Sequence, residues 1–358
     1  MTTDTISSLL GAIPMPAVLI GRGEHVVGAN ERALGLLGHA IVGHHFITAL
    51  RQPAILDAIE ACLRDGNTRQ TRYLSRDGAQ DTSFAVNCAP VDTVDTVDTG
   101  TGKGALICFE DVTHLEQAGQ MRRDFVANVS HELRSPLTAL LGFIETLRGP
   151  ARDDPAARAR FLKTMQDEAE RMERLVRDLL SLSRVEAQER VRPTDPVDLS
   201  RAIATVLHAL RPFAEERGVA IVANLPDAPV AVPGDADQLQ QVVTNLIENA
   251  IKYGGRDRAV HVSLKATDEE PTLRGPAAVI AVRDEGTGID PVHIARLTER
   301  FYRVDSHRSR HMGGTGLGLA IVKHIVGRHR GRLRIESKLG QGSEFRVVLP
   351  RDGVAPGG

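Results

Sequence analysis

The sequence predicts a multidomain α+β protein, on three observations. With 358 residues the chain is long for a single domain. Short apolar runs separated by turn residues fill residues 1–112, as in a small α/β unit, whereas residues 113–188 carry two long apolar seams with helical spacing. Over residues 189–354 helix and strand patterns alternate, with helices expected over 199–216, 235–253 and 318–328, which predicts a second α/β domain with a mixed sheet. We therefore expect three domains with these boundaries.

The composition excludes several function classes. Lysines and arginines number 44 against 46 acidic residues, so the net charge of −2 provides no basic surface for nucleic acid. Trp is absent and aromatic residues make up 3%, which argues against base stacking. No apolar run approaches the roughly 20 residues that a membrane span needs, and no signal-peptide pattern begins the chain. Three cysteines without metal-ligand spacing suit a reduced, cytoplasmic protein.

The elements of the first domain follow from its alternation of apolar runs and turns. Residues 17–20 and 25–27 flank Gly21-Arg-Gly23 and predict a β-hairpin. Helices are expected over 30–38, ending at a glycine, and over 55–63. Three further runs predict an antiparallel sheet: 71–74, 82–88 and 105–109. Before the last of these, Val-Asp-Thr occurs three times from Val91, which predicts a solvated extension of a hairpin.

Two amphipathic helices are expected in the middle of the chain. Residues 114–123 have helical spacing and should continue into the helix of the first seam. A loop rich in Gly and Pro, 148–155, separates that helix from the second. Two such helices form an αα-hairpin, and since one hairpin cannot cover both of its faces, we expect a homodimer with a four-helix bundle. The seam residues are Val126, Val129, Leu133, Leu140, Ile144 and Leu147, then Leu162, Met165, Ala169, Met172, Val176 and Leu179.

His131 lies between the seam residues Val129 and Leu133 and should point into solvent. Glu132 stands beside it, and Pro136 removes an amide donor five residues later, which should kink or loosen the helix. An exposed nucleophile next to a carboxylate and a helix distortion indicates a site. A lone histidine on an amphipathic helix would carry no such meaning.

Residues 130–137 read Ser-His-Glu-Leu-Arg-Ser-Pro-Leu and resemble the H-box of two-component sensor histidine kinases. The resemblance implies that His131 takes a phosphoryl group from ATP, that Glu132 accepts or orients its Nδ1 proton, and that the group passes to an aspartate of a response regulator. Many members also dephosphorylate the regulator, with Thr or Asn at the position of Ser135, and the serine leaves that activity open. Segment 125–134 is most similar to phosphate-regulon sensor kinases of the PhoR type, which implies a role in phosphate-starvation signalling.

The first domain resembles a PAS domain. The order of its elements, the segment Ala29-Asn-Glu-Arg-Ala33 and the closing Phe109-Glu-Asp-Val-Thr113 carry this resemblance. It implies either a bound ligand or dimer contacts, and the sequence leaves both open. Scattered histidines in a small domain are more often structural than haem or metal ligands. The histidines of this domain are His25, His39, His44 and His45.

Polar residues of the last domain form constellations that suit a nucleotide. Asn245, Asn249 and Lys252 lie at steps of four and three on one helix face. A neutral amide oxygen suits Mg²⁺ that phosphates already hold, and a lysine suits the phosphates themselves. Tyr253 adds a ring for a base. This helix therefore predicts one wall of a nucleotide site.

Three further constellations follow in the chain. Asp284 ends an apolar strand and is followed by Gly286 and Gly288, so that a carboxylate can accept from an exocyclic amine while backbone approaches the ligand. A Gly-rich turn before a helix can receive phosphates on free amides. The remaining residues are Phe301 and Arg303, upstream of a basic run, and Gly314, Thr315, Gly316, Leu317 and Gly318 in the turn.

Together and in this order these constellations match the N, G1, F and G2 boxes of the histidine-kinase ATP domain, an α/β-sandwich fold shared with gyrase, Hsp90 and MutL. The resemblance implies ATP and Mg²⁺ as cofactors. Asn249 would bind Mg²⁺, Asp284 would read adenine N6, and Tyr253 would pack near the base. Lys252 and Arg303 would contact phosphates. The hinge of a mobile lid would comprise Gly314, Gly316 and Gly318.

Two other classes share this fold. An ATPase of the Hsp90 or gyrase kind carries a water-activating Glu at the position of Asn245, and an amide cannot do that work. A pseudokinase scaffold would bind ATP and signal by dimer shape alone, but the motifs here are intact. Because His131 and the nucleotide residues lie in different domains, segment 189–196 is the expected hinge. The stimulus, the regulator and the choice between phosphorylation within or across the dimer stay open.

Overall fold

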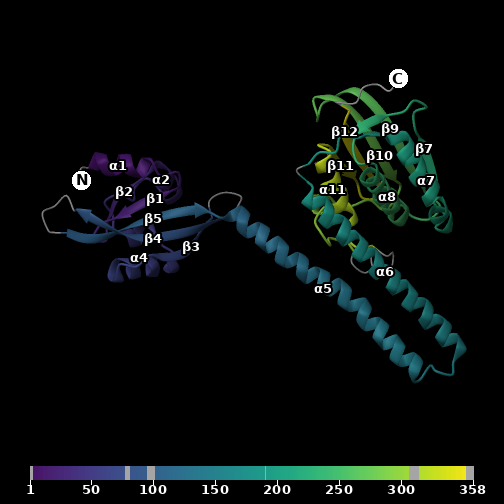
Figure 1. Cartoon of the computed structure of the whole chain (residues 1–358), viewed down its shortest axis with the longest axis horizontal. Coiled ribbons are helices and arrows are strands. Elements are labelled where there is room, and N and C mark those ends of the chain that lie inside the picture. Colours follow the sequence, from purple (N-terminus) through teal and green to yellow (C-terminus); the bar gives the residue numbers. More distant parts are fainter. Residues whose placement is uncertain (1–2, 77–80, 95–100, 190, 306–313, 352–358) are drawn as a thin grey trace. The chain divides into compact units, whose positions relative to one another are not determined.

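The computed structural model describes residues 3–76, 81–94, 101–189, 191–305 and 314–351 (Figure 1). The chain divides into two compact units, one ending at Ala127 and the other beginning at Asn128. This division falls inside one continuous helix, α5 (Thr113–Arg148). The three-domain boundaries expected from the sequence stay predictions.

The first unit is built on a five-stranded antiparallel sheet with the strand order β2-β1-β5-β4-β3. The predicted hairpin and the three later strands are confirmed. β4 and β5 pair as far as Val94 and Thr101, and residues 95–100, which include the last five residues of the Val-Asp-Thr repeat, lie outside the described residues. The strands are β1 (Ala17–Ile20), β2 (Val26–Ala29), β3 (Arg69–Ser75), β4 (Thr82–Val94) and β5 (Thr101–Asp111).

Helices cover both faces of this sheet. The larger core lies under α2 (Glu31–Leu37), α3 (Phe46–Ala49) and α4 (Pro53–Asp65), where alternate strand residues pack on Phe46, Ile55 and Ile59. On the other face, Ile6 and Leu10 of α1 (Thr3–Gly11) pack on β1, β2 and β5. The sequence predicted α2 and α4 but not α1 or α3.

A buried asparagine joins these layers. Asn30 is 6% exposed, and its Oδ1 accepts from the N–H groups of Ala17 at 3.1 Å and Ala33 at 2.9 Å. The second of these bonds caps α2. Its amide group donates to the carbonyl of Leu10 in α1 and to those of Ile13 and Met15 in the segment before β1.

The two long helices form the predicted hairpin. α5 runs through Pro136 to Arg148 without a break, and α6 spans Pro155–Ala187. Asp154 caps α6 by accepting from the N–H groups of Ala156 and Ala157 at 3.0 and 2.9 Å. Several apolar side chains of the hairpin are exposed in the single chain, namely Leu137, Leu141, Ile144, Leu162, Val176 and Leu180. Among the described residues, no helix is both long and apolar enough to cross a membrane.

The C-terminal sheet is mixed, as predicted. Its strand order is β11-β12-β10-β9-β7; β7 runs parallel to β9, and the other neighbours are antiparallel. The strands are β7 (Ala220–Asn224), β9 (Ala259–Glu270), β10 (Gly275–Asp284), β11 (Arg332–Ser337) and β12 (Ser343–Pro350). A short pair, β6 (Pro196–Asp198) with β8 (Ala231–Pro233), and the helix α9 (Pro291–Ile294) were not predicted.

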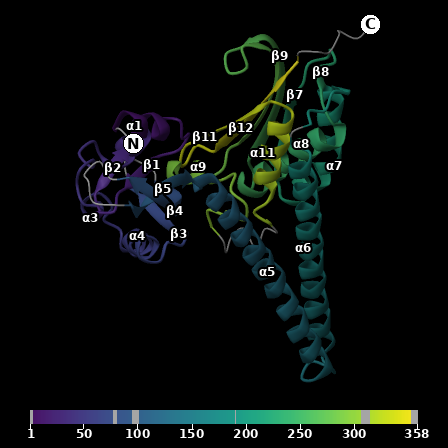
Figure 2. The same ribbon diagram turned by 60° about the vertical axis from the view of Figure 1, so that its left-hand side comes forward.

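Three helices lie over one face of this sheet, with α8 between the other two (Figure 1, Figure 2). α7 (Leu199–Glu216) and α11 (Gly318–Arg328) have the predicted bounds, and α8 (Ala236–Tyr253) begins one residue later than predicted because Asp235 is its N-cap. Their apolar faces bury against the strands and set the position of every predicted nucleotide residue on α8. The fully buried side chains include Leu239, Leu246, Ile280, Val282, Ile321 and Val347.

Candidate active site

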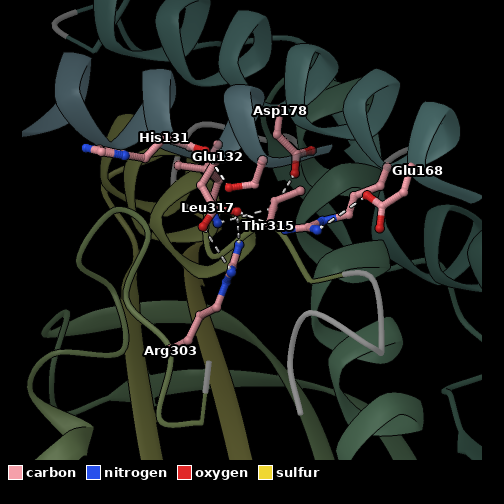
Figure 3. Close-up of polar contacts among 9 residues, drawn as sticks. His131, Glu132, Glu168, Asp178, Arg303, Thr315 and Leu317 are labelled. Carbon is pink, nitrogen blue, oxygen red and sulfur yellow. Dashed lines mark hydrogen bonds and ion pairs between the residues drawn. The ribbon is translucent and has the colours of Figure 1, made fainter. Parts of the chain in front are cut away.

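His131 is exposed on α5, as the seam predicted (Figure 3). The Oγ of Ser135, one helical turn later, donates to the carbonyl oxygen of His131 at 3.2 Å. Pro136 has no N–H for the carbonyl of Glu132, and its ring is buried. The imidazole is therefore reachable from solvent, while the helical turn that follows it lacks one backbone hydrogen bond.

Glu132 lies on two arginines. Its carboxylate accepts from both terminal nitrogens of Arg303, at 3.0 and 3.3 Å, and from Arg171 on α6 at 3.0 Å. All three side chains are largely buried, with exposed fractions of 21% for Glu132, 14% for Arg171 and 7% for Arg303. Figure 3 shows the ring of His131 pointing away from this carboxylate. The predicted contact of Glu132 with the Nδ1 proton is thus not the arrangement seen here, and that role stays a prediction.

The predicted polar face of α8 lies beside the start of α11. The amide of Asn245 donates to the carbonyl of Gly318 at 3.3 Å, which ties the two helices together. Lys252 pairs with Glu248 at 2.7 Å, and Tyr253 is 36% exposed. Asn249 is half-buried on the same face. The helix therefore presents an amide, a cation and an aromatic ring along one side.

Asp284, at the end of β10, is only 4% exposed. Burial raises the pKa of its carboxyl group, and backbone N–H groups of Gly286 and Ser343 act against that rise. The bond from the Gly286 N–H is 2.8 Å long. At Gly286 a Cβ would overlap the carbonyl oxygen of Tyr253, so the glycine brings the strand end against the end of α8. Asp284 and Tyr253 are thereby neighbours, as the nucleotide prediction requires.

Gly288 and Gly316 adopt left-handed backbone, with φ of +67° and +75°. A Cβ on Gly316 would lie 2.9 Å from the Cα of Phe301, and the Phe301 N–H donates to the Gly316 carbonyl at 2.8 Å. The turn 314–318 therefore packs directly on the segment that carries Arg303. Leu317, which has no side-chain acceptor, is the N-cap of α11. The basic run that follows Arg303, with Arg308, Arg310 and His311, lies outside the described residues.

Thr315 in this turn contacts α6. Its Oγ1 donates to Asp178 at 2.7 Å and accepts from the N–H of Leu317 at 3.3 Å. Burial raises the pKa of the Asp178 carboxyl group, and the hydrogen bond from Thr315 opposes the rise. Further along α6, Ser181 donates to Gln241 at 2.8 Å, and Glu186 accepts from Arg300 at 2.6 Å. One side of α6 thus holds the nucleotide-binding region by polar contacts.

Sequence reasoning did not identify Arg171 and Asp178. Both are charged residues next to the apolar seam, beside Met172 and Leu179, and they are seven residues apart. That spacing places them on one side of the helix two turns apart, which is the signal that could have found them. Their partners lie more than 35 residues away in sequence and only the fold brings them close.

The donor set fits Mg²⁺ only in company with a nucleotide. Within the described ranges, no group of three or more His, Cys, Asp or Glu side chains is placed to hold a metal ion. Asn249 offers one neutral oxygen, and Mg²⁺ with phosphate and water ligands needs little more from the protein. The residues present therefore suit an ion that arrives on phosphates.

Comparisons with known proteins agree with this geometry. Residues 121–188 match the family described as His Kinase A (phospho-acceptor) domain. Residues 234–353 match the family described as histidine kinase-, DNA gyrase B-, and HSP90-like ATPase. These two regions contain His131 and the four nucleotide constellations.

Curated relatives extend the match. The phosphate regulon sensor protein PhoR of Pseudomonas aeruginosa is 42% identical over 240 residues, covering 67% of this chain and 52% of that protein. The sensor protein kinase WalK of Staphylococcus saprophyticus is 38% identical over 328 residues, covering 90% of this chain and 51% of that protein. The chain thus spans about half the length of these relatives. A crystal structure of histidine kinase ThkA in complex with response regulator protein TrrA shares the fold, with a TM-score of 0.52, 19% identity and coverage of 97% and 98%.

Proposed function

Because this chain belongs to the two-component sensor histidine kinases, we propose that it phosphorylates His131 from Mg-ATP and passes the phosphoryl group to an aspartate of a response regulator. The observation that carries the proposal is the exposed His131 on α5, next to a carboxylate that contacts Arg303 of the nucleotide-binding region. Phosphoryl transfer asks a protein mainly to position groups and to neutralise charge. The described residues include groups that can position the nucleotide and cations that can neutralise its charge.

The nucleotide roles in this proposal are those that the family resemblance implies. Asp284 accepts from the adenine amine, and Tyr253 lies beside the base. Asn249 would hold Mg²⁺, which would neutralise phosphate charge, and Asn245 shapes the same helix face. Lys252 and Arg303 contact the phosphates after their present ion pairs, Lys252 with Glu248 and Arg303 with Glu132, have broken. Gly286 and Gly288 let backbone approach the nucleotide. The hinge of a mobile lid comprises Gly314, Gly316 and Gly318, and the remaining nucleotide-binding residues are Phe301, Thr315 and Leu317.

The chemical step is an in-line displacement. The Nε2 lone pair of neutral His131 forms a bond to the γ-phosphorus while the bond to the β,γ-bridging oxygen breaks, and ADP leaves with that electron pair. The Nδ1 proton passes to, or is held by, Glu132. The nucleotide residues reach His131 by a movement about segment 189–196.

Homodimerisation is part of the proposal. The exposed apolar side chains of α5 and α6 form the kind of face that a second hairpin covers in a four-helix bundle. The PAS-like assignment of residues 1–112, phosphate starvation as the stimulus, and a cytoplasmic site of reaction are also proposals. The first rests on the sheet and its helices, the second on the likeness to PhoR, and the third on the use of ATP and on three free cysteines.

Labelling with γ-³²P-ATP tests the proposal. We expect label that is stable to base, labile to acid and lost in His131→Gln. The matched control is His114→Gln, because His114 is also exposed on α5. Label that persists in His131→Gln would show that the nucleophile is another residue.

Regulator dephosphorylation is a separate activity with its own test. The Ser135 hydroxyl stands one turn after His131, where it can bind a water after releasing the backbone carbonyl. We expect Ser135→Ala to slow the decay of a phosphorylated regulator at least tenfold while leaving labelling of His131 within about threefold. Equal decay with both proteins would remove Ser135 from this role.

A further inference from the structure

Two groups of the predicted nucleotide site are held by the helical hairpin. Arg303 binds Glu132 on α5, and Thr315 binds Asp178 on α6. Both contacts join residues more than 130 positions apart in sequence, and both use side chains that the family resemblance assigns to the nucleotide. The helical hairpin and a bound nucleotide would therefore compete for the same two side chains.

The pair between Glu132 and Arg303 is bidentate, which is the strongest geometry for a guanidinium and a carboxylate. It nevertheless leaves part of Arg303 unsatisfied. Among the described residues, the buried Nε of Arg303 has no hydrogen-bond partner, and it faces the turn at Gly316, where a Cβ would lie 3.2 Å from it. A phosphate beside this turn would give that N–H an acceptor.

Arg171 gives Glu132 a second cation that does not depend on the nucleotide region. It belongs to the same hairpin, contacts Glu132 at 3.0 Å and lies 3.6 Å from Glu168. Two carboxylates and two guanidiniums thus alternate in one partly buried row. If Arg303 leaves the row, Glu132 keeps Arg171 and is not left as an unpaired buried charge.

We propose that Arg303 exchanges between Glu132 and the γ-phosphate of bound ATP, and that Arg171 is the positioning residue that keeps Glu132 beside His131 during the exchange. The proposal rests on the proposed function, because it requires a nucleotide in the site. It adds a consequence: the state shown here and the state with bound ATP exclude each other at Arg303. Release of Arg303 also frees one side of Glu132, which is the carboxylate expected to serve the imidazole.

Thermodynamic linkage makes this exchange measurable by binding alone. A ligand with a γ-phosphate must displace Glu132 from Arg303, whereas ADP lacks the γ-phosphate and does not. Removing the charge of Glu132 should therefore tighten binding of the first ligand only. Removing Arg171 should act in the opposite direction, because Glu132 would then attract Arg303 without a competing cation.

The test is titration of the full chain with AMP-PNP and with ADP in the presence of Mg²⁺. For Glu132→Gln we expect AMP-PNP to bind roughly 5- to 150-fold more tightly, the usual range of coupling between sites, and ADP to change less than about twofold. For Arg171→Met we expect weaker binding of AMP-PNP, restored towards the wild-type value in Arg171→Lys. Arg174→Met is the matched control, because Arg174 is exposed one turn further along α6.

The outcomes separate this proposal from the kinase assignment. A wild-type chain that binds neither nucleotide overturns both. A wild-type chain that binds both nucleotides, with Glu132→Gln changing the two affinities equally or not at all, overturns only the exchange. A shift of Glu132→Gln and Arg171→Met in the same direction also overturns it, since a merely structural role of the row predicts parallel losses.

Discussion

Asp284→Asn separates base recognition from folding at the predicted adenine site. The Oδ1 of the carboxylate accepts from the Gly286 N–H at 2.8 Å, and an asparagine keeps this acceptor. The Nδ2 group of the asparagine, a donor, replaces the second carboxylate oxygen, an acceptor. It would then face the amino group of adenine N6, which is also a donor. A hydrogen bond to a charged group contributes about 1.5–3 kcal/mol, which corresponds to a loss of about 10- to 150-fold in affinity for ATP.

The assay is competition between ATP or GTP and a fluorescent nucleotide on the full chain. Guanine has an acceptor, O6, in place of the amine, so we expect the preference for ATP over GTP to fall at least tenfold. Glu285→Gln is the matched control, because Glu285 is the next residue and its side chain is 38% exposed. The unfolding temperature should not fall, since the mutation removes a charge that burial disfavours. Unchanged ATP affinity, or parallel losses for ATP and GTP, would refute the role of Asp284.

Three further predictions concern stability. Asn30→Ala removes a helix cap and leaves the Ala17 N–H without its acceptor, so hydrogen exchange in β1 should report a loss of about 2–5 kcal/mol, with β12 unaffected; a loss below about 1 kcal/mol would contradict this. Gly288→Ala should lower the stability of the second unit by about 2 kcal/mol in urea unfolding, because φ is +67° and the new Cβ meets the Lys338 carbonyl, whereas Gly275→Ala, in open space, should not. Burial lowers the pKa of His329, whose Nε2 accepts from a backbone N–H. The contribution of this neutral histidine to the stability of the fold is therefore complete above pH 6.5 and is lost as pH falls below that value. The unfolding temperature of His329→Gln should fall less between pH 7.5 and 5.5 than that of the wild type.

Local patterns predicted the elements whose signals are complete within a few residues. α7 and α11 have the bounds expected from their apolar spacing, and Asn30 and Gly38 bound α2 as cap residues do. α1 was missed because it buries only Ile6 and Leu10 and depends on the outer face of a sheet formed by later strands. β6 and β8 were missed because three-residue strands acquire their pairing from a partner more than 30 residues away.

The candidate site divides in the same way. Motif spacing identified His131, Asp284 and the glycine turns, because each motif carries its own chemistry. It did not show that Glu132 would bind Arg303 rather than the imidazole, since 171 residues separate these side chains. Nor did it identify Arg171, which has no motif and matters only through that contact.

For this chain, then, the sequence alone determined which side chains are candidates for the phosphoacceptor and for the nucleotide site, because helix periodicity and short motifs act over a few residues. The tertiary structure decided which of these side chains hold one another. Ion pairs such as Glu132 with Arg303 depend on where two helices and a distant turn come together, and local spacing carries no information on that distance.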